Sequence, residues 1–139
     1  MFTRVAGMIL AAALMAAPAS AQDGADREAK ITQIFAHTLP NLPGKSVKGV
    51  LVEYGPGGHS AAHTHAPSAF IAATVLDGAI RSKVGDAPEA VYRKGDTFFE
   101  TPGAHHAVSA NASATAPARL LAVFVVNTDE TVLTIPDRE

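Results

Sequence analysis

From residue 31 to residue 135 the chain is a succession of short extended runs, each ended by turn-forming residues. Glycine, proline, asparagine and aspartate interrupt the apolar pattern at close intervals, and no segment keeps a helical period over about ten residues. Short runs rich in β-branched and aliphatic side chains are typical of strands. The expected strands cover residues 31–39, 45–54, 59–65, 70–76, 79–84, 90–93, 97–100, 106–109, 120–126 and 131–135.

Many short strands separated by turns predict an antiparallel sandwich or a closed barrel. Residues 70–76 are almost entirely apolar, which predicts a strand buried on both faces. The Asp77-Gly78 pair that follows predicts a hairpin with residues 79–84. An open α+β sheet is the alternative, but it requires helical segments that the sequence does not indicate.

Residues 1–21 have the three-part pattern of a secretory signal peptide. Arg4 supplies a positive charge, residues 5–17 form an apolar run, and residues 19–21 (Ala-Ser-Ala) fit a cleavage site. The apolar run is too short to span a bilayer. The pattern predicts a cleaved leader, a mature chain that starts at Gln22, and a periplasmic or secreted bacterial protein without membrane attachment. An uncleaved anchor or a buried helix is the alternative.

Composition excludes several classes of function. The sequence has 11 Lys and Arg against 13 Asp and Glu, with no block of like charge, so nothing favours nucleic-acid binding. It has no cysteine, which excludes disulfides, thiolate metal ligands and cysteine nucleophiles. It also lacks a nucleophile elbow and a phosphate-binding loop.

Two histidines one residue apart, His63 and His65, follow a glycine-rich turn. Alternate side chains of a strand point to the same face, so both imidazoles enter one small volume. A third imidazole comes from the adjacent pair His105 and His106; adjacent residues point to opposite faces, so one of the two is expected at the site. Three imidazoles from two strands predict a divalent-metal site with open coordination positions. His59 is an even number of residues before His63 and His65, so on a continuous strand its side chain points to the same face. It either reaches the rim of the metal site or is exposed to solvent.

The spacing of glycines and histidines resembles the two sequence motifs of the cupin family. Gly57 precedes His63-Thr64-His65 by the interval of the first motif, and Gly78 stands at its hairpin. The residues in register with the second motif are Gly95, Asp96, Gly103, His106 and Asn111. The likeness extends over residues 45–126.

The cupin resemblance implies an all-β fold, an antiparallel double-stranded β-helix or jelly-roll barrel. The barrel is expected over residues 45–135, after an N-terminal leader and first strand at residues 22–44 and before a C-terminal tail at residues 136–139. Cupin-like barrels commonly associate, so a homodimer is expected. The first strand and the apolar run at residues 120–126 are its candidate contacts.

The resemblance also implies a site inside the barrel. Carried over position by position, His63, His65 and His106 bind one divalent metal ion, with Fe, Mn, Ni and Zn as candidates. A small-molecule substrate or ligand is the implied partner, and metal-dependent oxygenases and isomerases are the implied activities. A non-catalytic module that binds a small ligand is the alternative.

One departure from the cupin motif concerns the carboxylate that follows the histidine pair. Its expected places hold Ala69 and Phe70, whereas Glu100 occupies a second-motif place that is usually apolar. An ionised carboxylate among aliphatic side chains is costly unless it is paired or metal-bound. Glu100 is therefore the candidate ligand or general base that replaces the missing glutamate. A solvent-facing strand end is the alternative for this residue.

Overall fold

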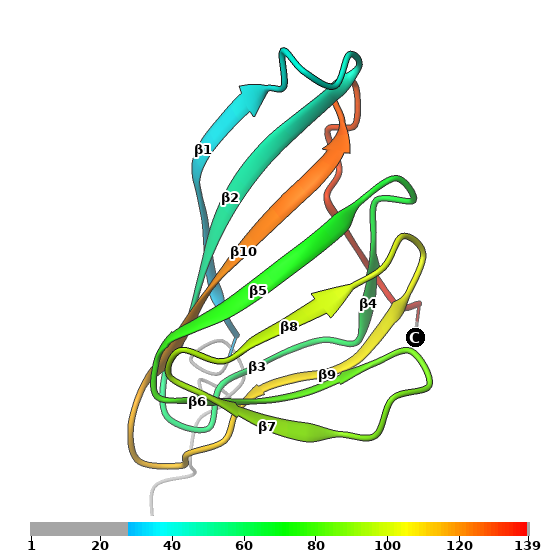
Figure 1. Ribbon diagram of the computed structural model, residues 1–139. Helices are drawn as coiled ribbons and strands as arrows, with labels where there is room; N and C mark the ends of the chain where they lie inside the picture. Colours follow the sequence, from blue (N-terminus) through cyan, green and yellow to red (C-terminus); the bar gives the residue numbers. More distant parts are fainter. Residues whose placement is uncertain (1–27, 139) are drawn as a thin grey trace, which may run out of the picture.

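The computed structural model describes residues 28–138, and every regular element in this part of the chain is a strand (Figure 1). The predicted signal peptide at residues 1–21 lies outside the described residues and stays a prediction. No helix within residues 28–138 is long and apolar enough to cross a membrane. The strands are β1 (Lys30–Thr38), β2 (Lys45–Tyr54), β3 (His59–Ser60), β4 (His63–His65), β5 (Phe70–Asp77), β6 (Ala79–Val84), β7 (Ala90–Arg93), β8 (Thr97–Glu100), β9 (His105–Asn111), β10 (Ala118–Asn127) and β11 (Thr134–Pro136).

These strands form two antiparallel sheets. The first has the order β1-β2-β10-β5-β8, and the second has the order β11-β4-β9-β6-β7, with β3 also paired to β9. In the first sheet β10 lies between β2 and β5, so strands far apart in the sequence are neighbours (Figure 1). The all-β antiparallel fold predicted from the spacing of the turns is confirmed.

Side-chain alternation explains how the core forms. On β10, Leu120 and Phe124 point inward and are 4% and 2% exposed, while the alternate residues Leu121 and Val123 lie on the outer face. β5 behaves in the same way, because its inward residues are buried whereas Phe70 is 42% exposed. The prediction that residues 70–76 are buried on both faces is wrong. An antiparallel sheet of this kind packs only one face against the core, even where the outer face is apolar.

The histidine-bearing segment differs from its prediction in one respect. The single strand expected at residues 59–65 is two short strands, β3 and β4, with Ala61 and Ala62 between them. Both strands pair with β9, at different points along it. The His63 and His65 pair therefore lies on a strand of three residues whose position depends on β9 and β11 on either side.

The hairpin between β5 and β6 depends on a glycine. Gly78 has a φ of 71°, and a Cβ there would lie 2.6 Å from the Pro117 oxygen and 2.9 Å from the Ala118 Cβ. Gly85 has a φ of 55° with nothing within 4 Å of its Cβ position.

Gly78→Ala is expected to lower the free energy of unfolding by at least about 2 kcal/mol, because backbone strain and overlap add together. The matched control Gly85→Ala adds only the strain and should cost about 1–2 kcal/mol. Urea denaturation of both variants measures the difference. Equal losses would show that the contact with residues 117–118 relaxes without cost.

Candidate metal centre

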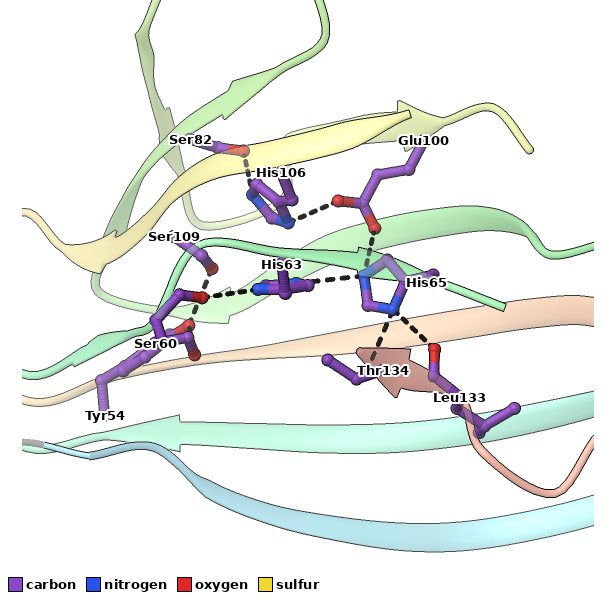
Figure 2. Close-up of polar contacts among 11 residues, drawn as sticks. Tyr54, Ser60, His63, His65, Ser82, Glu100, His106, Ser109, Leu133 and Thr134 are labelled. Carbon is purple, nitrogen blue, oxygen red and sulfur yellow. Dashed lines mark hydrogen bonds and ion pairs between the residues drawn. The ribbon is translucent and has the colours of Figure 1, made fainter. Parts of the chain in front are cut away.

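Three histidines meet inside the barrel on neighbouring strands. His63 of β4 is directly opposite His106 of β9, and His65 lies on the same face as His63 (Figure 2). The ring centroid of His63 lies 4.7 Å from that of His65 and 4.9 Å from that of His106. One ligand nitrogen from each of the three residues lies within 4.8 Å of the others. The cluster could hold a metal ion.

The other candidate histidines lie outside this cluster. His105 points to the opposite side of β9 from His106, and its Nε2 lies 2.7 Å from the carboxylate of Asp137. His59 is exposed and lines the mouth of the adjacent cavity. Of the adjacent pair considered from the sequence, the structure therefore brings His106 and not His105 to the cluster, as strand alternation requires.

The imidazoles of His63 and His65 each use Nδ1 for a backbone carbonyl. His63 Nδ1 lies 2.7 Å from the Ala61 oxygen, and His65 Nδ1 lies 3.0 Å from the Leu133 oxygen. Since a carbonyl oxygen can only accept, both Nδ1 atoms donate, and the lone pair of each neutral ring is on Nε2. The two Nε2 atoms lie 3.2 Å apart (Figure 2). Two lone pairs at this distance repel each other unless a cation or a proton lies with them.

Glu100 brings a carboxylate to the same point from the other sheet. It ends β8, is only 4% exposed, and points toward the histidines (Figure 2). Its Oε2 lies 3.1 Å from His65 Nε2, and its Oε1 lies 2.5 Å from His106 Nδ1. The solvent-facing alternative for Glu100 therefore does not hold.

The second contact of Glu100 is close but incomplete. Glu100 Oε1 and His106 Nδ1 are not aligned as a hydrogen bond, and neither buried atom has another hydrogen-bond partner within the described residues. On the far side of the same ring, His106 Nε2 lies 2.9 Å from the Ser82 hydroxyl. The hydroxyl can accept a hydrogen bond from Nε2–H, and in that tautomer the lone pair of Nδ1 points toward the cluster.

The electrostatics favour an ionised Glu100 carboxylate and a neutral His63 ring. Burial raises the pKa of Glu100, but its contacts with His106 and His65 outweigh burial and lower the pKa to about 2. Burial lowers the pKa of His63, and the hydrogen bond with the Ala61 carbonyl only partly opposes it. Metal ligation requires these protonation states.

The residues present fit a divalent metal ion. Nitrogen ligands in adjacent positions at about 2.0–2.1 Å from a metal lie about 3.0–3.4 Å apart, and the Nε2 atoms of His63 and His65 lie 3.2 Å apart. A cation there would also satisfy the unpartnered oxygen of Glu100 and nitrogen of His106. Ligands that are imidazole nitrogens and a carboxylate suit Fe, Mn, Ni or Zn better than a soft metal ion.

A cavity of about 230 Å³ adjoins the cluster, between the two sheets. Its floor is formed by buried and half-buried residues that include the histidines and Glu100, together with Ala73, Phe98, Leu120, Ala122 and Phe124. Its mouth is ringed by exposed residues: Glu28, Ile31, His59, Ala61, Thr134 and Pro136. The cavity therefore gives a small molecule access to the cluster.

Sequence reasoning missed a trio of hydroxyl groups in the same cavity. The Tyr54 hydroxyl lies 2.8 Å from Ser60 Oγ and 2.7 Å from Ser109 Oγ, and all three residues line the cavity (Figure 2). Burial raises the pKa of Tyr54, so the phenol is neutral. The inward position of Tyr54 could have been predicted from the sequence, because Tyr54 alternates with Val50 and Val52 on β2 and therefore points to the same face.

The C-terminal segment also serves the cluster, although the sequence indicated only an edge strand there. The Leu133 carbonyl and the Thr134 hydroxyl lie 3.0 Å and 3.2 Å from His65 Nδ1. The Asp137 amide donates to the Ala62 carbonyl, 2.9 Å away. These contacts orient the His65 ring, which is the usual task of groups just outside a metal's ligands.

The fold and the cluster together define a β-barrel protein with an internal, histidine-based candidate metal site. Residues 50–124, more than half of the chain, match the cupin domain family. The chain belongs to the cupin family, and its double-stranded β-helix fold agrees with the prediction. No match was found among curated protein sequences.

Solved structures show the same fold. The protein TT1209 from Thermus thermophilus is 25% identical, with a TM-score of 0.57 over 71% of this chain and 84% of that chain. A Klebsiella pneumoniae protein with a double-stranded β-helix domain is 19% identical, with a TM-score of 0.61 over 79% and 86%. An oxalate oxidase is 21% identical, with a TM-score of 0.56 over 73% of this chain and 56% of its own. For the Klebsiella protein and the oxalate oxidase, sequence identities of 19% and 21% show a shared fold and nothing about function.

Proposed function

We propose that this cupin binds one divalent metal ion through His63, His65 and His106 and acts on a small molecule held in the adjacent cavity. Glu100 serves as a fourth protein ligand or as a general base beside the metal. The observation that carries this proposal is the pair of Nε2 lone pairs that face each other at 3.2 Å beside an ionised, buried carboxylate. A single metal cation placed among these atoms would satisfy both lone pairs and the carboxylate together.

The residues of the chain have separate tasks in this function. When bound, the metal ion would act as a Lewis acid toward a substrate oxygen. The Ala61 and Leu133 carbonyls hold the rings of His63 and His65 in the ligating tautomer. Glu100, with a pKa of about 2, is ionised at neutral pH and able to ligate the metal ion. Service as a general base would require the bound metal or substrate to raise this pKa toward the working pH. The apolar floor of the cavity excludes water around the reacting group.

An oxygenase and an isomerase are the two activities that this proposal considers, and the metal separates them. An oxygenase requires a redox-active ion such as Fe or Mn, whereas an isomerase works equally well with Zn. Metal analysis of the protein as purified, followed by a substrate screen with Fe²⁺, Mn²⁺ and Zn²⁺ and an oxygen electrode, tests both. Absence of metal from the purified protein and failure to take up any of the three ions would contradict the proposal.

The second candidate function is a non-catalytic module that binds a small ligand. The cavity with its apolar floor favours binding whether or not a reaction follows. A ligand that raises the melting temperature of the metal-loaded protein without any turnover would favour this candidate.

Metal affinity is expected to decrease with acidity because protons compete for the imidazole nitrogens. Burial lowers the pKa of His63, so this ring is neutral at neutral pH and gains its proton below the usual histidine value of about 6.5. Glu100, with a pKa of about 2, stays ionised throughout this range. Titration with Zn²⁺ between about pH 8 and about pH 5 measures the decrease. An affinity that stays constant over this whole range would contradict ligation by the imidazoles and would leave Glu100, which stays ionised, as the binding group.

The homodimer stays a proposal, and β1 is its most suitable contact. β10 has a neighbour on each side, but β1 is an edge strand whose nine residues are all exposed. Ile34→Asp on β1 is expected to convert a dimer to a monomer, because Ile34 is 51% exposed and a charge opposes association there. Val91→Asp, on the edge strand of the other sheet, is the control. Sedimentation velocity measures both, and a monomeric unmodified protein would contradict the expectation.

Export to the periplasm or the exterior is also a proposal, supported by the pattern of residues 1–21. Cell fractionation of the full chain, with N-terminal sequencing of the product, tests it. A chain that starts at Gln22 in the periplasm is the expected result.

A further inference from the structure

The cavity beside the candidate metal centre has no Lys or Arg among its lining residues in the described part of the chain, and its histidine outside the cluster, His59, lies at the mouth. The carboxylates among these lining residues are those of Glu28 at the mouth and Glu100 on the floor. The remaining lining is mostly aliphatic or aromatic, with Val50 and Val52 on the walls and Leu120 on the floor. An anion on the apolar walls of this cavity therefore has no Lys or Arg as a counter-charge.

The charges at the centre leave room for a single negative charge. A divalent ion held by the Glu100 carboxylate and three imidazoles would have a net charge of +1, because ligating carboxylates are deprotonated and ligating imidazoles are neutral. One anionic oxygen from a ligand would neutralise it. A second carboxylate on the same ligand would lie against Val52 and Leu120 without a partner. Burying an unpaired charge among aliphatic groups is strongly unfavourable. At the mouth, the carboxylate of Glu28 would repel it further.

The hydroxyl trio accepts one further polar group, provided that it is uncharged. Tyr54, Ser60 and Ser109 together have three hydroxyl protons, and their two mutual hydrogen bonds use two of them. One proton remains for a carbonyl, ether or hydroxyl oxygen of a ligand. A lone neutral donor does not compensate the desolvation of a carboxylate, which normally accepts several hydrogen bonds.

We propose that the substrate or ligand of this site is a small molecule with at most one negative charge, at its metal-binding oxygen group, and an otherwise uncharged, mainly apolar body. Dicarboxylates are disfavoured relative to monocarboxylates of the same length. This inference rests on the proposed metal-binding function. The cavity of about 230 Å³ limits the body to less than the size of a typical drug molecule.

The test uses protein loaded with Co²⁺, whose visible absorption bands change when a ligand enters its coordination sphere. Butanoate and butanedioate are the probes, because they share a four-carbon chain and differ in the second carboxylate. Butanoate is expected to bind with a dissociation constant at least about tenfold lower than that of butanedioate. Equal binding, tighter binding of butanedioate, or no binding of either acid would overturn the inference. Metal analysis after the titration verifies that Co²⁺ stays bound.

A cation placed in the wall should reverse this preference. Val52 and Leu51 are neighbours on β2, but only Val52 lines the cavity, so Val52→Lys places an ammonium group at the cavity wall and Leu51→Lys serves as the control on the outer face. Butanedioate is expected to gain at least about tenfold in affinity in V52K and to be unchanged in L51K. No gain in a folded, Co²⁺-loaded V52K protein would contradict the inference. Failure of the unmodified protein to bind Co²⁺ would instead refute the proposed function on which it rests.

Discussion

Replacement of His106 by alanine is expected to reduce the metal content of the purified protein to background and to lower its affinity for Zn²⁺ by more than about a hundredfold. This loss exceeds the ten- to hundredfold effect of changing a group outside the ligands, because a ligand itself is removed. The adjacent residue provides the control. His105→Ala removes an imidazole from the outer face of β9, where it contacts Asp137, and should bind metal like the unmodified protein. Elemental analysis and a Zn²⁺ titration measure both variants.

Folding must be separated from ligation in this comparison, because His106 is 4% exposed and contacts Ser82. Thermal unfolding of the metal-free variants, monitored by circular dichroism, shows whether H106A keeps its fold. A folded H106A protein that retains full metal affinity would remove His106 from the site. Loss of metal in H105A to the same extent would show that the outer face matters as much as the cluster.

Substitution of Glu100 by glutamine is expected to lower metal affinity by at least about tenfold if the carboxylate is a ligand, because the amide oxygen that remains is a neutral and weaker ligand. The substitution keeps the shape of the side chain but removes the negative charge, which lies 3.1 Å from His65 and 2.5 Å from His106. The control is Glu89→Gln, because Glu89 is exposed and pairs only with Arg81, 2.9 Å away, among the described residues. Titration with Zn²⁺ measures both variants.

The two roles proposed for Glu100 have different outcomes. A ligand role predicts a loss of affinity in E100Q, whereas a role as general base predicts unchanged affinity with a loss of turnover. Unchanged affinity together with unchanged turnover would contradict both roles. Activity measurements at saturating metal separate these results once a substrate is known.

Much of the fold could be predicted because local patterns report it directly. Strands β2, β6, β7 and β8 have the bounds expected from the turn residues on either side, since clusters of glycine, proline and aspartate favour turns over extended structure. Burial was harder to predict. The exposure of Phe70 could not be predicted from the apolar run that contains it. Apolar residues occur both in a core and on the outer face of a sheet, so an apolar sequence does not distinguish the two.

The candidate site also has a part that the sequence predicted and a part that required the structure. The meeting of His63 and His65 follows from strand alternation, and the motif register selected His106, which the structure brings to the same cluster. The contact of Glu100 was only one of two alternatives from the sequence. Its resolution required the position of β8 in the opposite sheet, where the carboxylate is buried against the histidines.

The sequence alone determined an antiparallel all-β fold and the parity that places two imidazoles together, because both depend on neighbouring residues along one strand. Only the tertiary structure decided which distant groups complete the site. Leu133, Ser82 and the hydroxyl trio around Tyr54 come from separate segments, and their positions depend on how the two sheets pair and pack. Side-chain periodicity carries the first kind of information, whereas contacts between segments far apart in the chain carry the second.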